Sequence, residues 1–85
     1  MEIKNLWVTQ NGLRDYCQLK IMIDFVMSGG FWTQDVIDNF NHTKSNSLIH
    51  IAEFEDGVKY IHDGHHRCVA TILGGRDTLR DDEYF

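Results

Sequence analysis

The sequence predicts a single α+β domain, with a small mixed sheet that includes a β-hairpin and about three helices. Two observations favour this fold class. Two β-rich runs, 48–55 and 58–61, flank an Asp-Gly pair. Helix-like apolar stretches elsewhere end at paired glycines. The chain has 85 residues, 42% of them hydrophobic, so one domain over residues 1–85 with a modest core is expected.

The first half of the chain is expected to contain a strand and a helix. Residues 3–8 alternate apolar side chains and predict a strand. Residues 13–27 are long and apolar enough for a helix, which Ser28-Gly29-Gly30 would end. The apolar face of this helix is expected to consist of Cys17, Ile21, Met22, Phe25 and Val26.

Two shorter helices are predicted farther along the chain. Thr33 is a natural N-cap for a helix over 34–40. The last helix is expected from about His65 to Leu73, with Gly74-Gly75 beyond its end. Residues 76–85 are charged and aromatic, and they fit either a docked strand or a frayed tail.

Residues 48–61 carry the strongest local signal. Asp56-Gly57 is a favoured two-residue hairpin turn, and it would set His50 opposite Asp63. His50 would then lean toward the segment after Asp63, provided that no bulge interrupts the ladder. The residues expected on that face are Leu48, His50, Ala52, Phe54, Ile61 and Asp63.

Residues 62–70, His-Asp-Gly-His-His-Arg-Cys-Val-Ala, form the predicted functional segment. A strand-to-helix turn at Gly64 exposes backbone N–H groups at a helix N-terminus, which favours anions. Arg67 can hold two phosphate oxygens, and His65 or His66 can transfer a proton near neutral pH. The predicted phosphate-binding residues are Gly64, His65, His66 and Arg67.

Catalytic roles are predicted for His66, His50 and Asp63. His66 would act as a general acid or base, with His50 or Asp63 across the pocket. Two alternatives stay open at this point: Asp63 as an N-cap and His65 as a hydrogen-bonded core histidine. No resident metal is predicted, because adjacent residues on such a turn point in different directions. Mg²⁺ brought by a nucleotide is the expected cofactor, since Mg²⁺ prefers oxygen ligands.

Composition limits the function classes. The net charge of −5 argues against a broad electrostatic grip on DNA. No apolar run approaches the roughly 20 residues of a membrane span, and the N-terminus does not resemble a signal peptide. A cytoplasmic location with two free thiols is expected. Cys68 is expected to be a small buried side chain, with a reactive thiol as the alternative. The acidic residues expected in solvent are Asp77, Asp81, Asp82 and Glu83.

The run Asp63-Gly64-His65-His66-Arg67, with Ala70 one turn later, resembles the turn of the ParB/sulfiredoxin superfamily. The preceding strand and following helix extend the resemblance over about residues 48–75. Many members carry Asp-Gly-His-His-Arg at this place. The resemblance implies a compact α+β fold whose turn and helix N-terminus hold the phosphates of a nucleotide or a nucleic acid.

Departures from the family narrow this expectation. His65 stands where sulfiredoxin has its nucleophilic Cys, so thiol–phosphosulfinate chemistry is not expected. A full partition clamp is not expected from 85 residues. The expected function is phosphate recognition of a nucleotide, with phosphoryl transfer as its enzymatic version. A nuclease that cleaves phosphodiesters and a non-catalytic adaptor for a protein partner are the alternatives.

Overall fold

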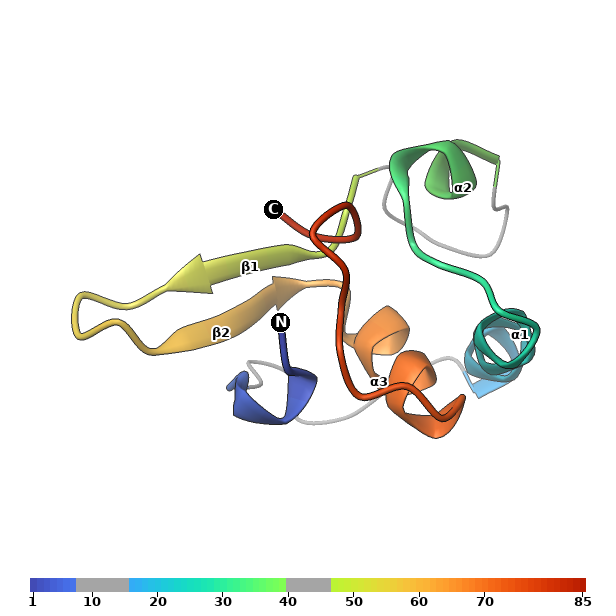
Figure 1. Ribbon diagram of the computed structural model, residues 1–85, viewed down its shortest axis with the longest axis horizontal. Coiled ribbons are helices and arrows are strands. Elements are labelled where there is room, and N and C mark those ends of the chain that lie inside the picture. Colours follow the sequence, from blue (N-terminus) through green and yellow to red (C-terminus); the bar gives the residue numbers. More distant parts are fainter. Residues whose placement is uncertain (8–15, 40–46) are drawn as a thin grey trace.

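The computed structural model describes residues 1–7, 16–39 and 47–85. The elements are a 3₁₀ helix η1 (Ile3–Asn5), helices α1 (Tyr16–Met27) and α2 (Gln34–Asn39), strands β1 (His50–Glu53) and β2 (Lys59–Asp63), and helix α3 (His65–Leu73). The two strands form an antiparallel hairpin, and α1 packs against α3 (Figure 1). The predicted small α+β fold is confirmed. None of the described helices has the length and apolar character needed to cross a bilayer.

The predicted strand at the N-terminus is wrong over residues 3–5, which form η1. Ile3 and Leu6 are both buried, and a three-residue spacing puts them on one side of a 3₁₀ turn. Among the described residues of this predicted strand, Trp7 is the one that pairs with β2. Its N–H donates to the Lys59 carbonyl at 3.0 Å, and its carbonyl accepts from the Ile61 N–H at 2.8 Å. Residue 8 lies outside the described residues.

Helix α1 ends at Met27, which confirms the predicted glycine stop. Its buried residues are Leu19, Met22 and Val26, whereas Cys17 is exposed and Ile21 is 40% exposed. The predicted apolar face is therefore wrong for these two side chains, because the helix turns a different side toward α3. Helix α2 follows Thr33 as predicted and is described from Gln34 to Asn39. Residues 13–15 and residue 40 of the predicted helices lie outside the described residues.

The hairpin loop has three residues rather than the predicted two. Phe54 N–H donates to the Val58 carbonyl at 2.8 Å, and Gly57 N–H donates to the Phe54 carbonyl at 3.0 Å. Gly57 has φ +87°, the left-handed conformation that closes such loops. The extra residue shifts the register by one, so that Ile51 pairs with Ile61.

A bulge between His50 and Ile51 corrects the register at the far end of the hairpin. His50 therefore does pair with Asp63, as predicted. The shift nevertheless separates residues that were expected on one face. Ile61 is 3% exposed and belongs to the core, whereas Phe54 is 50% exposed.

The C-terminal segment, residues 76–85, is docked and not frayed. The Ile49 N–H donates to the Glu83 carbonyl at 3.1 Å, and the Phe85 N–H donates to the Ile49 carbonyl at 3.0 Å. The segment runs beside β1, while Leu79 exchanges backbone hydrogen bonds with Met1 (Figure 1). The buried core residues are Ile3, Leu6, Leu19, Met22, Val26, Trp32, Ile49, Ile61, Cys68, Ala70 and Leu79.

Candidate functional site

Helix α3 begins at a left-handed glycine. Gly64 is the N-cap, with φ +102° and ψ +27°, and no side chain caps the helix. Asp63 is the exposed last residue of β2, so the N-cap alternative for Asp63 is wrong. A Cβ on Gly64 would lie 3.0 Å from Ile49 Cγ1 and 3.3 Å from a guanidinium nitrogen of Arg67. Glycine is thus required both by the backbone conformation and by the close approach.

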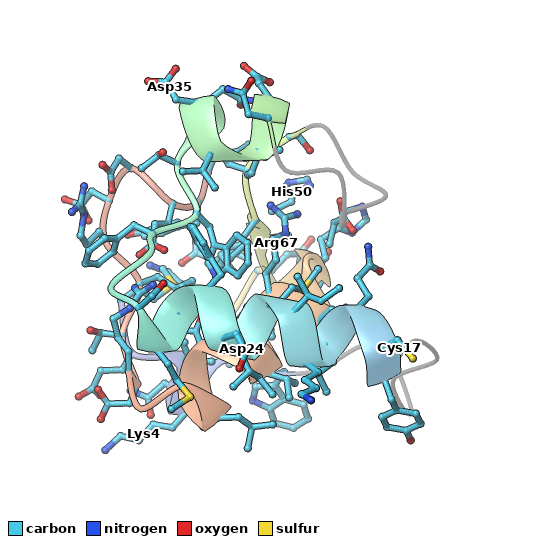
Figure 2. All side chains as sticks on the ribbon, turned by 90° about the vertical axis from the view of Figure 1, so that its right-hand side faces the viewer. Lys4, Cys17, Asp24, Asp35, His50 and Arg67 are labelled. Carbon is cyan, nitrogen blue, oxygen red and sulfur yellow. The ribbon has the colours of Figure 1, made fainter. Side chains whose placement is uncertain are left out.

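The Arg67 side chain turns back toward Gly64 and is buried, with 2% of its surface exposed. Its Nη1 donates to the Ser47 carbonyl at 2.8 Å. Its Nη2 is buried and has no hydrogen-bond partner among the described residues. Burial lowers the pKa of Arg67 from its ordinary value, and the negative charge of Asp63 opposes this shift. Arg67 therefore supplies one structural donor and one unused donor beside the start of α3 (Figure 2).

The neighbouring histidines differ in their surroundings. Nε2 of His66 is buried and, within the described part of the chain, lacks a hydrogen-bond partner. His65 is 8% exposed, and burial lowers its pKa from the ordinary value; Asp63 raises it and His66 lowers it further. Burial thus disfavours the charged form of His65, which fits the core-histidine alternative. The first turn of α3 thus carries two buried polar side-chain atoms that have no hydrogen-bond partner among residues 1–7, 16–39 and 47–85.

His50 reaches the same end of the hairpin through its pairing with Asp63. Its ring stacks on Phe85, with centroids 4.5 Å apart and planes at 8°, and meets His62 edge-on at 4.6 Å. These ring contacts place His50 on the sheet face that carries Phe85. Its role opposite His66 stays a prediction.

The structure bears on two further predictions, the burial of Cys68 and the metal site. Cys68 is 1% exposed, and burial raises the pKa of its thiol to about 12. This burial confirms the prediction of a small buried side chain. It disfavours the alternative of a reactive thiol, because a protonated, inaccessible thiol is a poor nucleophile. Across residues 1–7, 16–39 and 47–85, no three His, Cys, Asp or Glu side chains gather as a metal site.

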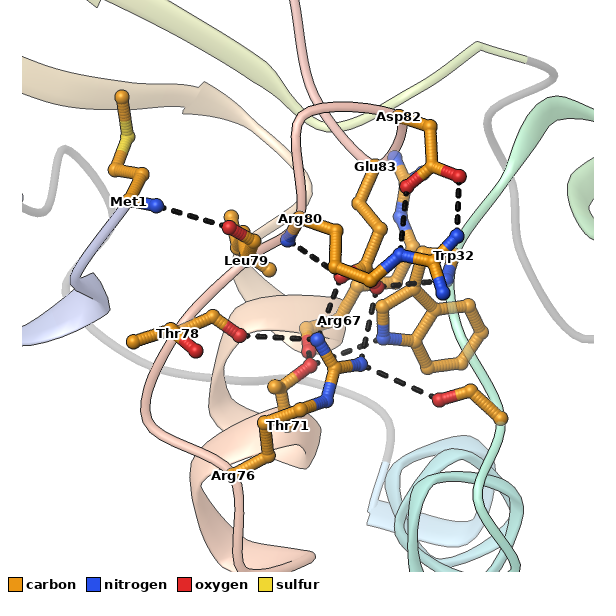
Figure 3. A network of polar contacts seen from close by, with 11 residues as sticks. Met1, Trp32, Arg67, Thr71, Arg76, Thr78, Leu79, Arg80, Asp82 and Glu83 are labelled. Carbon is orange, nitrogen blue, oxygen red and sulfur yellow. Dashed lines mark hydrogen bonds and ion pairs between the residues drawn. The ribbon is translucent and has the colours of Figure 1, made fainter.

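Glu83 lies in a buried polar network that the sequence did not indicate (Figure 3). Glu83 is 0% exposed, so its predicted place in solvent is wrong. Its carboxylate accepts from two nitrogens of Arg76 at 2.5 and 3.0 Å. It also accepts from the backbone N–H groups of Trp32 at 2.7 Å and Arg80 at 2.9 Å. Four donors compensate for the loss of water around this one buried charge.

The network continues into α3. The Trp32 indole N–H donates to the Thr71 hydroxyl at 3.0 Å, and that hydroxyl donates to the Arg67 carbonyl at 2.7 Å. Glu83 is therefore connected through Trp32 and Thr71 to the residue that carries the unused donor. The available sequence signal was the tryptophan itself, because a buried indole N–H requires an acceptor.

Comparisons of the chain with protein-family models, with curated proteins and with solved structures find no match. The ParB/sulfiredoxin-like assignment thus depends on the sequence resemblance over about residues 48–75, with the motif at residues 63–67 at its centre. It stays a prediction, and the chemistry of the site has to be argued from its own atoms.

Proposed function

We propose that this domain binds the phosphate group of a nucleotide or nucleic acid at the turn Gly64–Arg67. The observation that carries the proposal is the buried Nη2 of Arg67, which lacks an acceptor among the described residues and lies next to Gly64. A buried donor without a partner costs about 1–3 kcal/mol, and more when it is charged. An anion at this position would remove that cost.

The surroundings supply further donors for the same anion. The first backbone N–H groups of an α-helix have no intrahelical acceptor, and the helix dipole favours negative charge there. His66 adds a ring nitrogen that has no partner among the described residues. Nη1 of Arg67 is already bound to the Ser47 carbonyl, so Arg67 would offer one donor and not the two predicted from the sequence.

The charge of the chain favours a single-phosphate site over a duplex-binding surface. With a net charge of −5, the protein has few cations to replace counterions along a DNA backbone. The nuclease alternative for double-stranded DNA is therefore the weaker one. A protein-binding adaptor remains the non-catalytic alternative.

An enzymatic version would use His66 to hold or transfer a proton at a phosphate oxygen. The exposed carboxylate of Asp63 precedes the turn and would supply an oxygen ligand to Mg²⁺ arriving with a nucleotide. Positioning and charge stabilisation account for most of the catalysis in phosphoryl transfer. The same contacts would therefore serve binding and turnover.

Amide chemical shifts in a ¹H–¹⁵N NMR titration test the proposal directly. We expect inorganic phosphate, and more strongly ADP with Mg²⁺, to shift the amides of His65, His66 and Arg67. Chloride at equal ionic strength should not. The amides at the start of α2, a second helix N-terminus without a buried arginine, serve as the internal control. Equal shifts at α2 and α3 would refute a specific site.

Arg67→Lys provides the matched variant. A lysine ammonium can still donate to the Ser47 carbonyl, but the second donor beside Gly64 is lost. We expect phosphate affinity to fall about tenfold or more, since charge-assisted hydrogen bonds contribute about 1.5–3 kcal/mol. Unchanged affinity in a folded Arg67→Lys protein would rule out a role for Nη2.

A further inference from the structure

Five aromatic and histidine rings form a continuous row on one face of the hairpin, here named the ring strip. Its members are His50, Phe54, Tyr60, His62 and Phe85. Phe85 stacks on His50 at 4.5 Å, and His50 meets His62 at 4.6 Å. His62 faces Tyr60 at 6.3 Å, and Tyr60 stacks on Phe54 at 4.5 Å. The contacts link three segments of the sheet into one surface.

The shifted hairpin register creates the ring strip. Ile51 and Ile61 pair on the core side of the hairpin, so the alternate residues of both strands face outward. Tyr60 pairs with Ala52, whose small side chain leaves room for the rings beside it. Exposure at the two ends is high: Phe54 is 50% exposed and Phe85 is 57% exposed.

We infer that the ring strip is a base-stacking platform for a short single-stranded nucleic acid. One phosphate of that strand would be held at the turn Gly64–Arg67, so the inference rests on the proposed function. Every nucleobase has a flat π face, and stacking on protein rings holds single strands without requiring a particular sequence.

The position of the ring strip connects it to the phosphate site. His50 pairs with Asp63, the residue that precedes Gly64, so the strip begins where helix α3 begins. From there it extends to Phe54 near the hairpin loop. A phosphate at α3 would therefore leave the attached bases at the near end of the row.

The length of the ring strip favours an oligonucleotide over a mononucleotide. Phe54 lies four positions after His50 in the chain, which corresponds to roughly 13 Å in extended backbone. Stacked nucleotides advance by about 3.4 Å along a strand. The row is therefore longer than one base requires.

The chemistry of the ring strip suits a polyanion better than an acidic protein surface. None of its five side chains carries a carboxylate, and two of them are imidazoles whose ring N–H can donate a hydrogen bond to a phosphate oxygen. A duplex would not fit the role, because paired bases do not offer their faces. With one phosphate neutralised, the logarithm of the binding constant should fall with a slope of only about −0.7 against log salt.

Fluorescence anisotropy with labelled hexathymidylate tests the inference. We expect the protein to bind labelled hexathymidylate. An unlabelled abasic oligomer of the same length should displace it only at about tenfold higher concentration than unlabelled hexathymidylate. Phe54→Ala and His62→Ala should each weaken hexathymidylate binding about fivefold or more. Tyr16→Ala, which removes a 72% exposed ring on α1, should leave the affinity unchanged. Circular dichroism melting checks that each variant is folded.

The two proposals fail in different ways. Equal binding of the abasic oligomer, or full affinity in Phe54→Ala and His62→Ala, would overturn the ring strip while leaving phosphate binding intact. Phosphate-induced amide shifts without hexathymidylate binding would also overturn it. Loss of phosphate shifts together with Phe54-dependent hexathymidylate binding would instead support the ring strip and refute the site at α3.

Discussion

Replacing Glu83 by Gln should destabilise the fold far more than its local sequence suggests. The four atoms that contact the Glu83 carboxylate are all donors, two from Arg76 and two from backbone N–H groups. A glutamine side chain has one acceptor oxygen, and its NH₂ group, which is a donor, would lie against other donors. Breaking a buried ion pair by removing one partner costs about 3–5 kcal/mol. The whole stability of an 85-residue domain is about 4–13 kcal/mol.

Urea denaturation followed by Trp32 fluorescence measures this effect, because Trp32 is 0% exposed and lies against Glu83. A loss of 3 kcal/mol should also lower the melting temperature by about 12 °C or more. Asp82→Asn is the matched control. It removes the adjacent carboxylate, which pairs with Arg80 at the exposed surface, and should leave the urea midpoint nearly unchanged. Equal midpoints for the two variants would refute the buried network as the source of stability.

Three further predictions concern the turn and its neighbours. Gly64→Ala should destabilise by about 1–3 kcal/mol in urea, because it combines left-handed strain with a 3.0 Å approach to Ile49, whereas Gly75→Ala carries the strain alone and should cost less. In the native protein at pH 8, iodoacetamide should label the exposed Cys17 and spare Cys68, as peptide mass spectrometry would show; rapid labelling of Cys68 would contradict its burial. Folding lowers the pKa of His65, so the unfolded chain binds more protons than the folded protein as the pH falls through about 6.5. The free energy of unfolding should therefore decrease over that pH range, and His65→Gln should make this decrease smaller.

Local features of the sequence predicted most of the secondary structure. Paired glycines placed the ends of α1 and α3, because positive-φ turns and chain stops depend on a few adjacent residues. The hairpin was also predicted, but its register was not. Asp56-Gly57 fits a two-residue turn and a three-residue loop equally well, and one residue reverses which side chains face the core.

Features that depend on distant partners could not be predicted. Nothing near Glu83 in the sequence indicates that Arg76 and the backbone of Trp32 enclose it. Which side of α1 is buried likewise depends on its packing against α3, a contact that the sequence of α1 does not indicate. At the turn, the sequence predicted Gly64 and Arg67 as a unit. It did not predict that Arg67 would lie beneath the glycine and contact the Ser47 carbonyl.

The unused donor of Arg67 would connect the stability of the fold with the proposed phosphate binding. Three features hold the turn. Gly64 packs so closely against Ile49 that a Cβ would not fit, and the Arg67 side chain donates a hydrogen bond to the Ser47 carbonyl. Hydrogen bonds from Glu83 through Trp32 and Thr71 reach the Arg67 carbonyl. Nη2 of Arg67 is buried and has no acceptor among the described residues. An anion that completes the site should therefore stabilise the native state, by about 2.7 kcal/mol at 100 times its dissociation constant. Because the same network orients Arg67, a folded variant that loosens it should lose phosphate affinity together with thermal stability.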